Sequence, residues 1–138
     1  MSDKITMKSH IDFNKIPGLM AATDEAVSRG VLAAAIDVHG QAVELVPVIT
    51  GNLKGSLSWS GQSITGGYEG ADAPPIATSR DRHTAHVGTN VVYGPSVEFG
   101  GKGRSPKSYL RAAMGIKEQD AKAIIARYIK AGAEGATR

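Results

Sequence analysis

A long run of apolar residues at helical spacing constrains the fold of this chain more than any other feature. Along residues 16–45, small and aliphatic side chains recur at steps of three and four, among them Val31, Ala34, Val38 and Leu45. This spacing places them on one face of a helix. Asn14 suits the cap, Pro17 suits the first turn and Pro47 prevents continuation. The sequence therefore predicts a helix from Pro17 to Leu45, about 43 Å long. Gly30 and Gly40 weaken this helix, so a bend at either position remains open.

After Pro47 the spacing of apolar residues changes from helical to alternating. Leu53, Leu57 and Trp59 alternate with Lys54, Ser56, Ser58 and Ser60. A two-residue period predicts a half-buried strand over 53–61, preceded by a turn at 50–52. Two more strands are expected over 85–89 and 91–99, at an edge or with bulges because of Gly88, Gly94 and Pro95. The glycines and prolines of 61–82 predict a long loop or a mobile hairpin arm.

A second helical stripe occupies the C-terminal part of the chain. It opens at Pro106 and runs through apolar residues from Tyr109 to Ile129, with Gly115 as a possible early interruption. Residues 1–14 and 131–138 are expected to be flexible. The order helix, strands, helix predicts one α+β domain over 1–138. In it the long N-terminal helix and the C-terminal helix pack on one face of a small antiparallel β-sheet.

Composition narrows the possible functions. The chain has 138 residues, of which 41% are hydrophobic and only 5% aromatic, so the core must be thin and built from Val, Ile, Leu and Ala. There is no cysteine, which excludes disulfides, thiolate metal sites and a cysteine nucleophile. The net charge of +3 permits contact with DNA without arguing for it. No apolar run is long enough to cross a bilayer.

Motifs for catalysis or cofactor binding are weak in this sequence. The string at 100–105 brings glycines, cations and a hydroxyl together but lacks the spacing of a phosphate-binding loop. His83 and His86 would point to opposite faces of a strand, and surface positions suit them better than a shared metal. No GxSxG elbow is present. We therefore expect no cofactor, no metal and no catalytic residue, and a protein that is not an enzyme.

Two charged features are candidate contacts. Glu98 sits in an apolar strand end, where it can face solvent or pair with an arginine of the same or a neighbouring chain. A local basic cluster can meet phosphates, meet an acidic partner surface, or simply be solvated, and it consists of Lys102, Arg104, Lys107 and Arg111. Trp59 and Tyr109 are expected to fill the core.

Three strings, in this order, resemble a known family. The first has the form P-x-x-T-G-x-L-basic-x-S and contains Pro47, Thr50, Gly51, Leu53 and Ser56. The second has the form Y-x-x-x-V-E-F-G and contains Tyr93, Glu98, Phe99 and Gly100. The third is a proline-led helix start with Pro106 and Leu110. Together they resemble the small tail-component family of long-tailed bacteriophages, which joins or completes the tail at the head-to-tail connection. The match departs from the more usual family residues near Gly55 and at 94–96.

The resemblance implies a structural protein of the virion, assembled in the cytoplasm of a host bacterium. It implies a homo-oligomeric ring of six subunits around the DNA channel, with DNA only as channel contents and no membrane. Its neighbours would be neck and tail-tube or tail-terminator proteins. Tail completion, tail termination and head closure remain open as roles.

Within such a ring, we expect partner contacts from Tyr93, Glu98, Phe99 and the basic cluster. The segment 61–82 would serve as an arm that orders against adjacent rings. The alternative function is a small DNA-binding protein that uses the basic cluster on phosphates. Salt separates the two, because phosphate binding weakens steeply as ionic strength rises.

Overall fold

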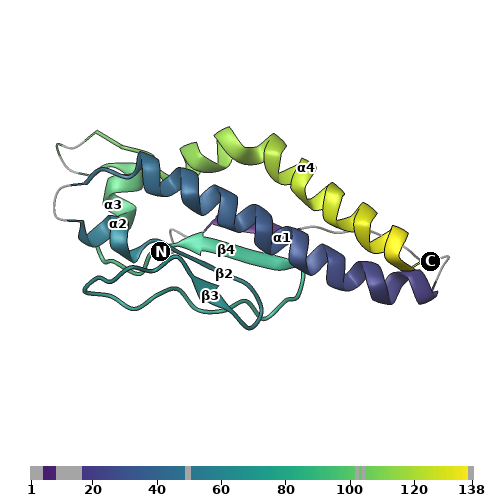
Figure 1. Ribbon diagram of the computed structural model, residues 1–138. Helices are drawn as coiled ribbons and strands as arrows, with labels where there is room; N and C mark the ends of the chain where they lie inside the picture. Colours follow the sequence, from purple (N-terminus) through teal and green to yellow (C-terminus); the bar gives the residue numbers. More distant parts are fainter. Residues whose placement is uncertain (1–4, 9–16, 49–50, 102, 104, 137–138) are drawn as a thin grey trace.

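The computed structural model describes residues 5–8, 17–48, 51–101, 103 and 105–136. Long helices and a small sheet make up these residues (Figure 1). In chain order the elements are β1 (Ile5–Lys8), α1 (Pro17–Leu45), α2 (Asn52–Ser56), β2 (Ser58–Ser60), β3 (Thr65–Gly66), β4 (Thr84–Gly88), α3 (Gly94–Phe99) and α4 (Leu110–Ala136). The two long helices pack against the antiparallel sheet, which confirms the predicted α+β fold.

Helix α1 has the predicted bounds, Pro17 to Leu45, and runs unbroken through Gly30 and Gly40. Its stripe of small and aliphatic residues, from Val31 to Ala42, is buried in the core. The expected cap, Asn14, lies outside the described residues. Pro47 follows the last turn, as expected from a residue that cannot continue a helix.

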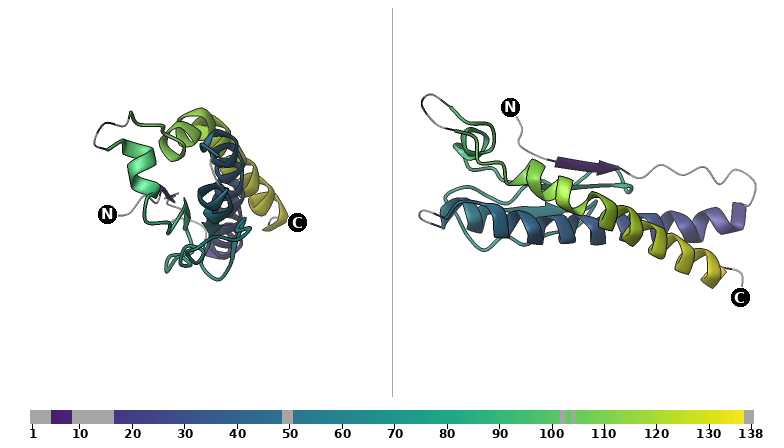
Figure 2. Two further views of the ribbon diagram at one scale, coloured as in Figure 1. Left: turned by 90° about the vertical axis from the view of Figure 1, so that its left-hand side faces the viewer. Right: turned by 90° about the horizontal axis from the view of Figure 1, so that it is seen from above.

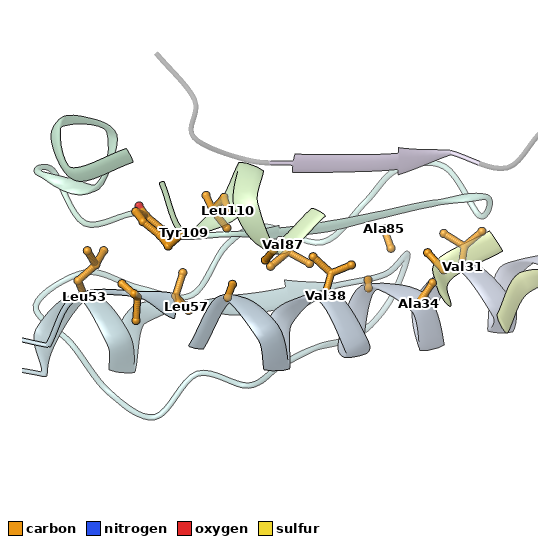
Figure 3. Close-up of a cluster of buried hydrophobic side chains, with 14 of the residues drawn as sticks. Val31, Ala34, Val38, Leu53, Leu57, Ala85, Val87, Tyr109 and Leu110 are labelled. Carbon is orange, nitrogen blue, oxygen red and sulfur yellow. The ribbon is translucent and has the colours of Figure 1, made fainter. Parts of the chain in front are cut away.

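The sheet is four-stranded, antiparallel and ordered β1-β4-β2-β3. Strand β4 lies between β1 and β2, with Val87 opposite both Ile5 and Trp59. Ala85 and Val87 of β4 enter the core that α1 covers (Figure 3). Strand β1 falls within residues 1–14, which were expected to be flexible, so that prediction is wrong for 5–8. A four-residue polar-apolar segment carries too weak a signal to reveal its pairing.

The strand predicted over 53–61 is wrong in its first half. Residues 52–56 form the short helix α2, and only 58–60 form a strand. Leu53 and Leu57, four positions apart, are both buried, and this spacing fits one side of a helix as well as alternate positions of a strand. Gly51 supplies the positive φ of 82° at the start of α2.

The strand predicted over 91–99 is also wrong. This segment turns at 92–93 and forms α3, whose first turn contains Pro95. Proline favours the first turn of a helix, so the residue that suggested a strand edge in fact starts a helix.

The segment 61–82 is a loop with a short hairpin, as predicted. It lies along the surface of the domain and does not project from it. The Ser79 N–H donates to the Gly61 carbonyl at 2.8 Å, and Ile76 is buried. The Tyr68 hydroxyl donates to the Ala73 carbonyl at 2.7 Å. The first bond joins the two ends of the loop, the Tyr68 bond closes a turn within it, and the buried Ile76 holds the loop against the domain.

Helices α1 and α4 form a long antiparallel pair that continues beyond the sheet (Figure 2). Gly30 allows the close approach, because a Cβ there would lie 3.0 Å from the Tyr128 Cβ and 3.2 Å from the Ile125 Cα. Further along, Lys117 Nζ lies 3.5 Å from Asp37 Oδ1. Helix α4 begins at Leu110, passes Gly115 without a break and reaches Ala136, so the expected frayed end from 131 is wrong over 131–136.

The core lies where α1, the start of α4 and β4 meet (Figure 3). Tyr109 and Leu110 enter it from the start of α4, and Leu53 and Leu57 from α2 and the residue that follows it. Tyr109 is fully buried and Trp59 is half-buried against the same cluster, which confirms the core position predicted for both rings. Within the described part of the chain, no helix is both long enough and apolar enough to cross a membrane.

Candidate functional site

Residues from all three motifs meet at one end of the domain, where α2 and α3 lie near the start of α4 (Figure 1). The Tyr109 hydroxyl donates to the Gly94 carbonyl at 3.0 Å, which joins α4 to α3. The Asn52 side chain donates to the Tyr93 hydroxyl at 2.9 Å, which joins α2 to the start of α3. We call this region the α3 end.

Glu98 is the centre of the α3 end. Although it was expected at the surface or in an ion pair, its side chain is only 1% exposed and it caps α4. Its Oε1 accepts N–H groups of Tyr109, Leu110 and Arg111, the shortest being 2.6 Å from Leu110. The first N–H groups of a helix lack partners within the helix, so a carboxylate from another helix satisfies them.

The second carboxylate oxygen of Glu98 binds side chains. Its Oε2 accepts the Ser108 hydroxyl and the Arg111 Nε–H, the latter at 2.9 Å. Arg111 also donates from Nη2 to the Glu98 carbonyl at 3.0 Å. Glu98 thus pairs with an arginine of its own chain, one of the alternatives that the sequence left open.

Burial and hydrogen bonding act on the Glu98 carboxyl in opposite directions. Burial by itself raises its pKa, because the charged form loses solvation. Hydrogen bonds from Ser108, Arg111 and the backbone of Leu110 and Arg111 favour the charged form and outweigh burial, so the pKa lies below its ordinary value. Glu98 is therefore ionised at neutral pH, and its role is to hold α4 rather than to transfer a proton.

Arg111 links this buried carboxylate to the surface. Its side chain is 55% exposed, and its guanidinium lies 4.5 Å from the centre of the Phe99 ring. Such a cation–π contact fixes the orientation of both groups. Phe99, itself 46% exposed, is thereby held at the surface beside a charge.

Most other motif residues serve the backbone of this end. Ser56, fully buried, donates to the Leu53 carbonyl at 2.6 Å and also bonds the Thr89 hydroxyl. Gly51 and Gly100 both have positive φ, Pro106 lies in the extended lead into α4, and Leu53 and Leu110 are in the core. Thr50 lies outside the described residues. Most residues of the three motifs therefore stabilise the fold of the α3 end.

The α3 end carries apolar side chains on its surface. Val92 is 93% exposed and Tyr93 is 40% exposed, and both immediately precede α3, whereas Phe99 ends it. We call these three residues the α3 patch. Exposed apolar side chains at both ends of one short helix make this helix a candidate contact surface. Tyr93 and Phe99 were predicted contacts, but Val92 was not.

The predicted basic cluster is divided by the structure. Lys107 is exposed, and its backbone N–H donates to the Val97 carbonyl at 2.9 Å, which places it at the end of α3. Arg111 is bound to Glu98 and Phe99. Lys102 and Arg104 lie outside the described residues.

Sequence reasoning missed Asn52, Asp72 and Ser108. Asn52 donates to Asp72 Oδ1 and accepts the Asp72 backbone N–H, which ties the loop to α2. Ser108 accepts the Ala112 N–H at 3.2 Å as it donates to Glu98. A serine just before an apolar helical stripe is a cap signal, so Ser108 was detectable, whereas the partner of Asn52 lies 20 positions away.

The histidines serve structural contacts. His39 Nε2 lies 3.0 Å from the Leu57 carbonyl oxygen, and burial lowers its pKa, only partly offset by that contact and by Glu69. His83 Nε2 lies 2.5 Å from Asp24 Oδ1. His39 is thus half-buried. The described residues contain no group of three His, Asp or Glu placed to hold a metal ion.

Comparison with known proteins adds no family. No family model, no curated protein and no solved structure matches this chain. The function must therefore be argued from the motifs and from the α3 end itself.

Proposed function

We propose that this chain is a non-enzymatic structural protein of a tailed bacteriophage, a subunit of a homo-oligomeric ring at the head-to-tail joint. In this role six copies surround the DNA channel, and neck and tail-tube or tail-terminator proteins lie above and below them. The ring is assembled in the host bacterium and remains in the virion. DNA passes through the channel without being read.

The α3 patch is the observation that carries the proposal. The motifs that resemble the tail-component family gather at the α3 end, and apolar side chains are exposed there on a framework held by buried hydrogen bonds. A rigid framework with exposed apolar groups is what a subunit needs to bind a partner without changing its own fold.

The position of Glu98 changes one detail of the earlier expectation. A carboxylate that already binds four residues of its own chain has little capacity left for another subunit. In this proposal Glu98 stabilises the fold beneath the contact surface. The surface itself consists of Tyr93, Phe99, Val92 and Lys107.

Native mass spectrometry over a concentration series tests this function, at low and high salt and with and without a short DNA duplex. We expect a closed oligomer of one subunit count that persists at high salt and does not bind the duplex, because apolar burial depends little on ionic strength.

The contradicting result is a monomer that binds the duplex at low salt and releases it as salt rises. That outcome would favour the alternative, a DNA-binding protein. This alternative is based on the positive charge of the segment between Glu98 and Glu118. That segment has Lys or Arg at 102, 104, 107, 111 and 117 and no acidic residue.

A further inference from the structure

The two ends of α3 carry opposite charge. At its N-terminal end, Val92 and Tyr93 lie beside an acidic loop, because the Asn52 Nδ2 group donates to both the Tyr93 hydroxyl and Asp72 Oδ1, at 2.9 Å each. Glu69 is in the same loop, where its N–H donates to the Gly55 carbonyl. We call Val92, Glu69 and Asp72 the acidic border.

The C-terminal end of α3 is basic. Phe99 lies under the Arg111 guanidinium, and the backbone N–H of Lys107 donates to the carbonyl of Val97, two residues before Phe99. We call Phe99, Lys107 and Arg111 the basic border. Glu98 neutralises Arg111, so Lys107 carries the net charge of this border.

Apart from Arg111, the charged residues of these borders have no ion-pair partner within the described part of the chain. No ion pair of those residues includes Glu69, Asp72 or Lys107, and all three are exposed. Lys54 on α2 is the cation nearest in sequence to Asn52. The acidic border keeps a net negative charge even when Lys54 is included. From Gly55 to Ser79 the sequence contains no Lys or Arg.

The chain segments that carry the two borders lie on different sides of α3. In Figure 1 the segment 105–109 runs above α3 on its way to α4, whereas the loop that follows β3 runs below it. Each border combines a charge with an exposed apolar side chain, Phe99 on one and Val92 on the other. The two surfaces are thus complementary to each other in charge and alike in apolar character.

We propose that copies of this chain bind one another through these borders, the basic border of one copy against the acidic border of the next. This inference rests on the proposed ring and identifies its subunit interface. A contact between two different patches, one from each end of α3, is head-to-tail, and such a contact generates a ring when the rotation closes.

Charge reversal with rescue tests the interface, with native mass spectrometry and sedimentation of the full chain as the measurements. Lys107→Glu and Asp72→Lys should each weaken association by about tenfold or more, because like charges then face each other. The double variant should recover most of the wild-type association. Lys130→Glu makes the same change of net charge on the exposed face of α4, away from the borders, and should have no effect.

Thermal melting of each variant shows whether the fold is intact, and Val92→Asp provides a second test that does not depend on charge pairing. A wild-type oligomer that neither charge reversal nor Val92→Asp weakens would overturn this interface while leaving the ring standing. Loss of association in both single variants without recovery in the double variant would also overturn the pairing. A wild-type chain that stays monomeric over the whole concentration series would overturn both proposals.

Discussion

The α1–α4 pair and the α3 end are held together by different kinds of interaction. In the pair, two regular helices pack along small side chains, and several charges form ion pairs within or between them, as in Glu25–Arg29 and Asp37–Lys117. At the α3 end, two helices of five and six residues are held by side chains that bond backbone groups of other elements. Regular side-chain packing along the two helices stabilises the first region, and a few specific hydrogen bonds stabilise the second.

This difference predicts different responses to mutation. The loss of one exposed charge from the helix pair leaves its packing unchanged, and exposed pairs contribute little. The loss of one buried acceptor at the α3 end leaves several N–H groups without partners. The largest effects of single substitutions should therefore be found at the α3 end.

Glu98→Ala should have the largest effect. Removing a buried charge that caps α4 should lower the free energy of unfolding by about 3 kcal/mol. This value is at the low end for a broken buried ion pair, because the partly exposed Arg111 can be solvated by water when it loses its partner. Urea denaturation measures the loss. Glu118→Ala removes one partner of the exposed pair with Lys122 and should cost less than about 0.5 kcal/mol.

If the two variants lose equal stability, the contrast between the regions is wrong. The same reasoning predicts a clear loss of stability for Glu98→Lys, because Glu98 is buried.

Two glycines of α1 provide the next test, because only one of them lies at the helix contact. Gly30→Leu should destabilise the protein by about 2 kcal/mol, since the added side chain would press against Ile125 and Tyr128. Gly40→Ala should stabilise it by about 0.5 to 1 kcal/mol, because a Cβ there meets no atom within 4 Å and alanine favours the helix. Thermal melting of both variants gives the signs. A neutral Gly30→Leu would contradict the close crossing of α1 and α4.

The smallest effect concerns pH and His39, which lies between the two regions. Its pKa is lowered in the folded protein from the ordinary value of 6.5, so the unfolded chain binds a proton more readily. Stability is therefore fully present above pH 6.5 and falls as the pH drops below it.

The His39→Gln variant should lose less stability than the wild type between pH 7 and pH 5. The difference between the two proteins in chemical denaturation is the informative quantity, because the substitution changes only the contribution of His39. Parallel pH profiles would show that burial of His39 has no effect on stability.

Periodicity predicted the helix pair well because each residue there depends mainly on neighbours three and four positions away. The first helix was predicted from Pro17 to Leu45, and these are its observed ends. The apolar stripe that contains Leu110 and Ala113 indicated the second helix. Gly30 shows the limit, since it was read as a weak point of α1. The structure shows a close crossing there, where even a Cβ would come within 3.0 Å of Tyr128 on α4.

The α3 end was predicted poorly because short elements take their conformation from distant partners. Leu53 and Leu57 fit a strand or a helix equally well, and the strand was chosen wrongly. Pro95 was read as a strand edge, although it begins a helix. Tyr93 and Phe99 were recognised as candidate contacts from the motif, whereas Asp72 and Val92 became candidates only once the loop and α2 were placed beside α3.

The sequence by itself determined the two long helices, the presence of a small antiparallel sheet packed against them and the absence of cysteine chemistry, because periodicity and composition act locally. Only the tertiary structure decided that Glu98 is buried and caps α4, and that opposite charges lie at the two ends of α3. These features join residues far apart in the chain, such as Asn52 with Tyr93 and Glu98 with Leu110. Their energies depend on burial and on distances between atoms, which follow from the packing of the whole domain.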